Sequence, residues 1–315
     1  MRIEGRRIHI AGSADKDTPE HLLSYAHELV AHLVQELSKE GATFILSVGK
    51  EPLSQPENPS SPSIIFDWTA LAATHKSLQD GIAHAQGVQG RLITTVVTSK
   101  TERQIPEYRR HIWNELRAAN AVKLVFIEPG WASGGLRRTR QAQLGDILIA
   151  LSGGEGVEHL AQEYTAAGKP VIPLDLDIGS SRGDGSGGAA RLAREALAHP
   201  ERFARHPDPD AAGDLLARLA THQGKVVTTE VVKAVIDVIH ALESPTVFYV
   251  RLLNSALPEF GSVERFFRNV LDPVVKKFGY KAVEMGREAS TYAWMNEAIF
   301  DSLREHFLTQ KSKVN

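Results

Sequence analysis

The chain has 315 residues, with 36 lysines and arginines against 38 aspartates and glutamates and a formal net charge of −2. This balance gives no general attraction to nucleic acid or to an anionic membrane, so anion binding must come from local clusters of cations. The absence of cysteine excludes disulfides, thiolate nucleophiles and cysteine-ligated zinc, and the 13 histidines show no metal-ligand spacing.

The first elements expected are a strand over residues 7–13, a helix that Thr18 caps, and a second buried strand over residues 42–48. The right-handed crossover rule makes these two strands parallel neighbours in one sheet. Gly12 and Ser13 end the first strand, where a glycine serves the turn as often as it serves a ligand.

The segment 51–63 is rich in proline, serine and asparagine and is expected to be an exposed loop. Two interpretations stay open, a lid that closes over a ligand and a tolerated surface insertion. The α/β alternation then continues with a helix over 68–85, a strand over 91–98, a helix over 105–119 and a strand over 122–128.

Two groups of arginines flank the next glycines: Arg109 and Arg110, then Arg137, Arg138 and Arg140 just after Gly134 and Gly135. In a doubly wound sheet these guanidinium groups could converge on the ligand crevice, where their forked geometry suits phosphate oxygens. The alternative is a solvated helix face whose arginines have partners three residues away.

Residues 144–174 form the most informative stretch, a complete strand, glycine turn, helix and second strand. The apolar strand 146–151 is broken by a turn that comprises Ser152, Gly153, Gly154, Glu155 and Gly156. A helix follows from about residue 157, Gly168 ends it, and residues 171–174 form the next strand. The free N–H groups at the start of such a helix favour an anion, so the turn is a candidate phosphate site.

A second glycine-rich loop surrounds Arg182 before a helix that starts near residue 189, and it is either a flap over the ligand or a plain linker. Helices are expected over 210–221 and 228–242, and a boundary at 243–245. Beyond the boundary we expect a strand at 246–252, a helix at 263–278, a strand at 280–283 and a helix at 292–307. The pattern predicts a Rossmann-like doubly wound parallel α/β sheet over residues 1–242, and a small α/β segment over 243–315.

Five separated segments carry a family resemblance: IPEYRRHIWNEL, PGWASGGLRRTRQAQLGD, SGGEGVEHLA, GKPVIPLDL and SSRGDGSGGAARLAREAL. Together they resemble the SLOG or STALD domain, a Rossmann-like domain of the LOG and Smf/DprA type that is associated with sirtuin and TIR effectors. The likeness covers residues 7–203. The segments VFYVRLLN, VERFFRNVLDPVVKKFGYKAVEMGR and AWMNEAIFDSL resemble the first half of a TIR-like or nucleoside deoxyribosyltransferase-like domain.

The resemblance implies a receptor for an adenine-containing signal, cyclic or of the ADP-ribose type, that regulates a TIR-like or associated effector in bacterial anti-phage defence. Its binding site would comprise the following residues: Gly12, Ser13, Arg109, Arg110, Arg137, Arg138, Gly153, Gly154, Glu155, Gly156 and Arg182.

The alternative is an enzyme, a LOG-type phosphoribohydrolase or an NAD-cleaving glycohydrolase. LOG-type enzymes carry a glutamate at the end of GGxGTxxE, and the corresponding position here is Leu160. Glu155 and Glu158 remain as candidate catalytic acids, because such a group must reach the ribose to stabilise positive charge or to position water. For Glu158, a favourable charge at a helix N-terminus is the competing interpretation.

The expected partners follow from these observations. A nucleotide is the only ligand expected, with no required cofactor and no metal. We expect a homo-oligomer, with an effector protein as a further partner. Nucleic-acid binding, which a DprA relative would suggest, is disfavoured by the near-neutral charge. No apolar run approaches the roughly 18 residues that cross a bilayer, and the start MRIEGRRIHI lacks the apolar core of a secretion signal, so a cytoplasmic protein is expected.

Overall fold

The computed structural model describes residue 3 and residues 5–58, 61–83, 91–130, 133–176, 178, 188–203, 209–222 and 228–242. One compact unit comprises Arg2–Ile239. The expected strands, helices and TIR-like likeness beyond residue 243 lie outside the described residues, as does Arg182 with most of its loop.

The core of this unit is a six-stranded parallel sheet in the order β4-β3-β2-β1-β5-β6. The strands are β1 (Arg7–Ser13), β2 (Thr43–Ile45), β3 (Ile93–Val97), β4 (Val122–Phe126), β5 (Ile147–Ser152) and β6 (Val171–Leu174). Every residue of β5 is buried, as expected for a parallel strand that is covered by helices on both faces. The strand order reverses between β1 and β5, which is where doubly wound sheets bind ligands. The predicted Rossmann-like fold class is confirmed.

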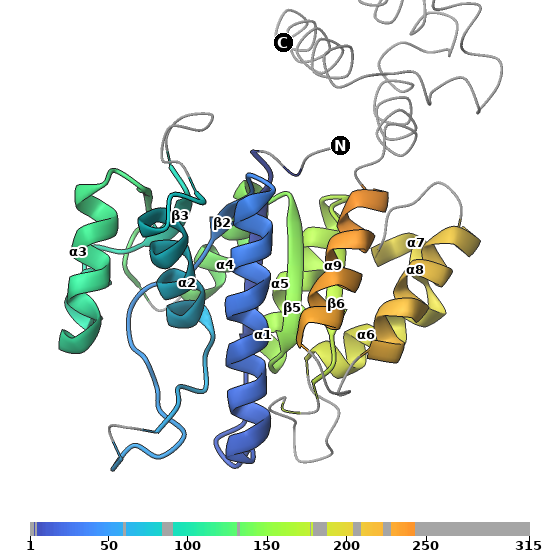
Figure 1. Ribbon diagram of the computed structural model, residues 1–315, viewed down its shortest axis with the longest axis horizontal. Helices are drawn as coiled ribbons and strands as arrows, with labels where there is room; N and C mark the ends of the chain where they lie inside the picture. The colour runs from blue at the N-terminus through green and yellow to red at the C-terminus, as the bar shows by residue number, and fades with distance from the viewer. Residues whose placement is uncertain are drawn as a thin grey trace, which may run out of the picture. The chain divides into compact units, whose positions relative to one another are not determined.

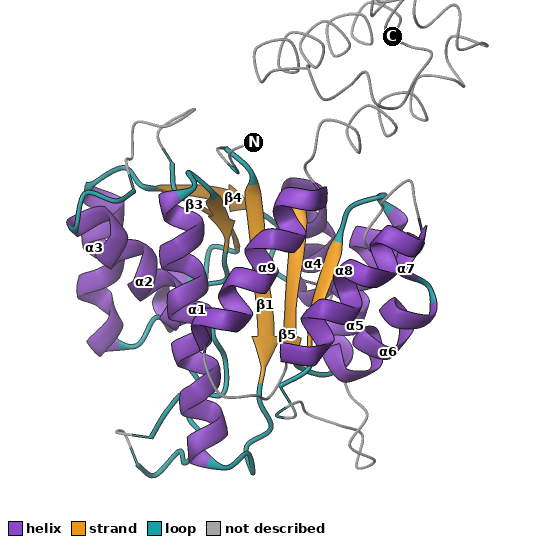
Figure 2. Ribbon diagram, turned by 45° about the vertical axis from the view of Figure 1, so that its right-hand side comes forward, coloured by secondary structure: helices purple, strands orange, loops and turns teal. Residues whose placement is uncertain are grey.

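Helices cover both faces of the sheet (Figures 1 and 2). The first layer contains α1 (Glu20–Lys39), α2 (Asp67–Gln79), α3 (Arg110–Ala118) and α9 (Thr228–Leu242). The other layer contains α4 (Ser133–Leu144) and α5 (Glu155–Ala166), which are followed by α6 (Ala189–Ala198), α7 (Pro200–Phe203) and α8 (Pro209–His222). Two short 3-10 turns, η1 (Glu102–Gln104) and η2 (Glu107–Arg109), lead into α3. None of the described helices is both long and apolar enough to span a membrane.

The first helix joins the sheet to the last described helix. Its apolar face is buried on the sheet, through Leu23, Ala26, Leu29, Val30, Leu33, Val34 and Leu37. The Thr228 hydroxyl at the start of α9 donates to Glu28 at 2.8 Å and lies 2.9 Å from Nδ1 of His32. Residues 196 and 200 positions apart are thereby linked, so the start of α9 belongs to the same compact unit as β1.

Two local predictions need correction. The Thr18 hydroxyl does not cap α1, because it donates to the carbonyl of Ile178 at 3.3 Å, and Pro19 takes the cap position without a side-chain hydrogen bond. The expected helix over 105–119 begins later, since the stretch from Glu107 is a 3-10 turn and α3 starts at Arg110. In the first case a tertiary contact has replaced the local bond that the sequence pattern favoured.

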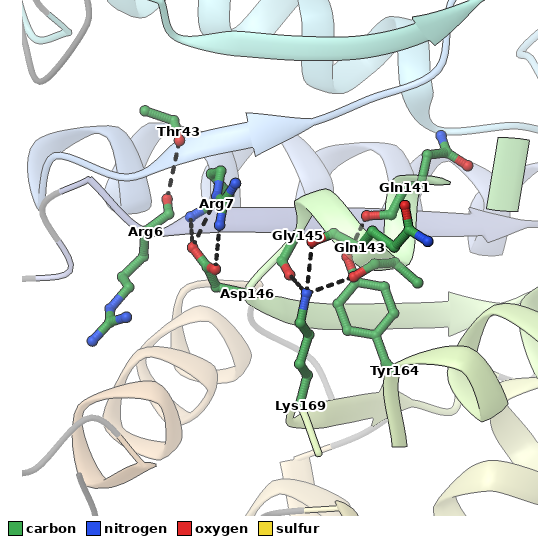
Figure 3. Close-up of polar contacts among 10 residues, drawn as sticks. Arg6, Arg7, Thr43, Gln141, Gln143, Gly145, Asp146, Tyr164 and Lys169 are labelled. Carbon is green, nitrogen blue, oxygen red and sulfur yellow. Dashed lines mark hydrogen bonds and ion pairs between the residues drawn. The ribbon is translucent and has the colours of Figure 1, made fainter. Parts of the chain in front are cut away.

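The edge of the sheet at the amino ends of β1 and β5 is stabilised by a polar cluster (Figure 3). The Lys169 ammonium group donates to the carbonyls of Ala142, Gln143 and Gly145 at 2.6–2.9 Å, at the C-terminus of α4. These are carbonyls that a helix leaves without an internal partner, and a cation there also suits the helix dipole. A Cβ at Gly145 would lie 1.8 Å from the hydroxyl of Tyr164, so only glycine fits.

The same cluster contains an ion pair between neighbouring strands. Arg7 donates to both carboxylate oxygens of Asp146, at 3.2 Å from Nε and 2.8 Å from Nη2, and its backbone N–H donates at 2.9 Å (Figure 3). Burial raises the pKa of Asp146, but the Arg7 hydrogen bonds outweigh burial and hold that pKa below its ordinary value. His9 is neutral, because burial lowers its pKa to about 3. The cluster is therefore a structural clamp, away from the carboxyl ends of the strands.

Candidate functional site

The predicted glycine turn lies at the carboxyl end of β5, beside β1. Ser152 and Gly153 adopt left-handed φ angles of 45° and 78°, so the chain reverses within two residues and α5 begins at Glu155. The Gly153 N–H donates to the carbonyl of Ser13 at 2.7 Å, which ties the turn to β1. A Cβ at Gly153 would lie 2.3 Å from Cγ2 of Val157. The turn thus requires glycine and places the start of α5 at the switch point of the sheet.

The start of α5 has the features of an anion site. Gly154 occupies the N-cap position and no side chain caps the helix. Arg138 approaches this end from α4, because its Nη1 would lie 4.0 Å from a Cβ built on Gly156. The Arg138 Nε donates to Nδ1 of His159 at 3.2 Å. A guanidinium group therefore stands beside the positive end of a helix dipole, and both favour an anion.

Gly12 and Ser13 lie where the sequence placed them, next to the turn. A Cβ at Gly12 would lie only 2.1 Å from the carbonyl oxygen of Leu151 on the neighbouring strand. The close approach of β1 and β5 explains this glycine, independently of any ligand. Ser13 contributes the backbone carbonyl that accepts from the turn.

Glu158, one of the two candidate acids, is held by another helix. One carboxylate oxygen accepts from the Gly188 N–H at 3.2 Å, and the other lies 3.4 Å from Nη1 of Arg191. Gly188 itself sits on the turn, since a Cβ there would lie 2.0 Å from the carbonyl oxygen of Gly153. Glu158 therefore binds the residue that precedes α6 and an arginine in the first turn of that helix. These contacts explain the Glu158 carboxylate as a structural link between α5 and α6, without any role in catalysis.

The second candidate acid, Glu155, and the position of the expected catalytic glutamate, Leu160, differ in exposure. Glu155 is exposed in the first turn of α5. Leu160, which stands where the resemblance would place a catalytic glutamate, is 3% exposed and belongs to the hydrophobic core. No carboxylate thus enters the crevice from position 160.

A polar cluster that the sequence did not predict lies at the carboxyl end of β2. The Asp67 carboxylate, at the start of α2, accepts from the Ser47 N–H at 2.7 Å, and Gln141 of α4 donates to the Ser47 hydroxyl at 3.0 Å. Burial raises the pKa of Asp67 to about 6, against the opposing effects of the Ser47 hydrogen bonds and the Arg137 charge. The Nε of Arg137 is buried and makes no hydrogen bond in the described part of the chain.

This cluster has the properties of a functional site. A carboxyl group whose pKa is raised to about 6, near a half-buried arginine and at the carboxyl end of a parallel sheet, is typical of ligand-binding and catalytic positions. The sequence signal was weak, because an aspartate in the first turn of a helix is ordinarily explained by the helix dipole. Its partners, Ser47, Arg137 and Gln141, come from two other segments of the chain.

The remaining predicted arginines have other partners. Arg109 pairs with Glu51 through two hydrogen bonds of 2.7 Å, and Arg110 pairs with Glu107 at 2.6 Å. Arg140, the third arginine of the group on α4, donates to Gln143 at 2.8 Å, as the solvated-face interpretation expects. Of these arginines, the structure brings Arg138 to the turn and Arg137 to Asp67. Among the described residues no group of three or more histidines, aspartates and glutamates is arranged to hold a metal ion.

Comparison with known proteins identifies relatives of this chain. A family model described as "ATP nucleosidase Cap17-like, N-terminal" matches residues 3–239. Two proteins named ATP nucleosidase Cap17, from Escherichia coli and its strain KTE188, are 24% identical over 180 residues, covering 57% of this chain and 34% of each relative. This chain therefore spans about a third of their length. A solved structure, the molybdenum cofactor carrier protein of Chlamydomonas reinhardtii, is 18% identical, with 62% of this chain and 99% of that chain covered and a TM-score of 0.31.

Proposed function

This chain belongs to the family of ATP nucleosidase Cap17-like N-terminal domains, and we propose that its residues 3–239 are a receptor for an adenine-containing nucleotide. The observation that carries the proposal is the uncapped start of α5 at the β1/β5 switch point, with Arg138 beside it. A phosphate group would bind at this helix start, where backbone N–H groups and a guanidinium group converge. The Asp67 cluster would face the rest of the nucleotide.

Binding is favoured over cleavage by the surroundings of the turn. Glu158 is engaged by Gly188 and Arg191, and Leu160 has no carboxylate to offer. The SLOG-type resemblance adds that the ligand is cyclic or of the ADP-ribose type, and that its binding regulates an effector in anti-phage defence. A ligand that prefers one state of the protein shifts the population toward that state, and assembly of copies would be one readout.

The proposal is tested by calorimetric titration of ADP-ribose, ATP and a cyclic adenine dinucleotide into the protein. Arg138→Met should weaken binding of the recognised nucleotide about tenfold, the effect of one charge-assisted phosphate contact. Arg140→Met is the matched control, because this arginine lies on the same helix and is exposed, with Gln143 as its partner. Absence of binding by all three nucleotides at millimolar concentration, or equal loss in both variants, would refute the proposed receptor.

A second candidate function, N-glycosidic hydrolysis, is favoured by Asp67 and by the activity in the relatives' name. Hydrolysis adds a water oxygen to C1′ of the ribose while the base leaves with a proton. A carboxyl group with a pKa of about 6 can accept the proton of the attacking water or donate one to the departing base. Incubation with ATP and with NAD, followed by chromatography for free base, tests this function. Turnover must disappear in Asp67→Asn and persist in Glu158→Gln for this assignment to stand.

A further inference from the structure

A cavity of about 390 Å³ lies between α1, α2, η2 and the segment that follows β2. This volume is within the range of small-molecule pockets. The cavity lining includes Ser24 and His27 of α1, Glu51 and Leu53 of the segment after β2, and Tyr108 and Arg109 of η2. The family comparison and the glycine turn give this cavity no role.

The charged side chains that line the cavity neutralise each other. Arg109 and Glu51 form a bidentate pair, in which the Glu51 side chain is only 2% exposed and the Arg109 side chain 26%. Burial lowers the pKa of His27, which favours the neutral form of its ring. The ring lies 2.7 Å from the Ser63 carbonyl and 2.6 Å from the Thr69 hydroxyl, which fixes its orientation. The wall therefore selects against a strongly charged ligand, whose desolvation it would not offset.

The same wall offers an aromatic surface and hydroxyl groups. Tyr108 is 53% exposed, and the Arg109 guanidinium group lies 5.5 Å from the centre of its ring. This cation is held in place by Glu51 and thereby orients the ring. Ser24 is exposed on α1 at the same cavity, and a hydroxyl group can both donate and accept hydrogen bonds. A stacking ring beside hydroxyl groups is suited to a planar ligand with ring nitrogens.

The cavity is separated from the glycine turn by two paired segments. Ser13 accepts from Gly153 on one side, while Ala14 donates to the carbonyl of Ile64 at 2.7 Å on the other. Ile65 also bridges to Ser13. The backbone from Ser61 to Ser63, which lines the cavity, continues directly into this paired segment. The paired segments at residues 13–14 and 64–65 would thus separate a molecule in the cavity from a phosphate bound at α5.

We propose that this cavity binds an uncharged, planar heteroaromatic molecule of nucleobase or nucleoside size, stacked on Tyr108, at a site separate from the phosphate-binding turn. The proposal does not depend on the receptor function assigned to α5. It assigns the Glu51–Arg109 pair a positioning role: the pair holds the aromatic ring and leaves no net charge at the site.

Adenosine is the probe for this site, titrated calorimetrically into the protein. We expect saturable binding that Tyr108→Ala weakens at least about tenfold and that Tyr108→Phe, which keeps the ring, weakens by less than about threefold. Ser24→Trp should abolish binding by filling the cavity. Gln162→Trp, at an exposed position of α5 on the opposite face of the sheet, is the matched control and should bind as the unsubstituted protein does. The thermal unfolding midpoint of each variant verifies that it is folded.

Three results would overturn the proposal. The first is absence of adenosine binding at millimolar concentration, and the second is unchanged affinity in both Tyr108→Ala and Ser24→Trp. The third is loss of ADP-ribose binding in Ser24→Trp, which would make the cavity part of the α5 site. Retention of ADP-ribose binding in that variant supports two sites. If no nucleotide binds at α5 but adenosine still binds and responds to Tyr108→Ala, the receptor proposal fails while this one stands.

Discussion

Asp67→Asn is expected to make the protein more stable at neutral pH, while removing the hydrolysis that is the second candidate function. The carboxyl pKa rises from its ordinary 3.8 to about 6 in the folded protein, chiefly because the group is buried. A raised carboxyl pKa contributes stability below 3.8, and that contribution is lost as the pH rises through about 6. At pH 7.5 the ionised group therefore costs the folded state up to about 3 kcal/mol, from 1.36 kcal/mol per pKa unit.

Asparagine keeps an oxygen that accepts from the Ser47 N–H, so most of the local hydrogen bonding survives the substitution. The loss of a charged acceptor offsets about 1 kcal/mol of the gain, which leaves a net stabilisation of about 2 kcal/mol at pH 7.5. About half of this difference in the free energy of unfolding should appear between pH 5 and pH 7.5, where the native carboxyl group ionises.

Urea unfolding of both proteins across that pH range measures this difference in the free energy of unfolding. Asp80→Asn is a suitable control, because Asp80 is exposed beside Lys76 and its replacement should change stability by less than about 0.5 kcal/mol. Asp67→Asn would contradict this prediction if it were no more stable than the unsubstituted protein at pH 7.5, or if its advantage did not grow with pH.

Three further predictions concern the sheet. Lys169→Met should lower the free energy of unfolding in urea by about 2 kcal/mol, because three carbonyls lose their donor, and should leave nucleotide binding unchanged; a loss below about 0.5 kcal/mol would contradict the clamp. Asp146→Asn should cost about 2 kcal/mol at pH 7, and the difference should shrink as the pH falls below 3.8, because the native pKa is lowered; a pH-independent difference would argue against the ion pair. Gly12→Ala should cost at least about 3 kcal/mol in thermal unfolding, whereas Gly135→Ala, with open space around its Cβ, should be neutral or stabilising by up to about 1 kcal/mol; similar effects in both would refute the packing argument.

The local sequence determined the elements around the glycine turn. Residues 147–151 are a continuous apolar run, which is typical of a strand covered on both faces, and β6 and α9 begin and end where periodicity and turn residues placed them. Gly168 ends α5 with a left-handed φ of 69°, as its position predicts. These features depend on the spacing of neighbouring residues, so one segment suffices to reveal them. The doubly wound arrangement then follows from the handedness of the crossovers.

Tertiary structure alone decided which charged residues meet. Asp67 encounters Arg137 although they lie 70 positions apart in the sequence, and Glu158 reaches the start of α6 instead of the crevice. Arg109 forms an ion pair with Glu51, so this arginine is not one of the free phosphate ligands that the sequence suggested. Side-chain pairing across helices depends on the register of the elements and on the exact direction of each side chain, which periodicity does not encode. The charge of a residue can therefore be read from the sequence, but the group that compensates it appears only in the fold.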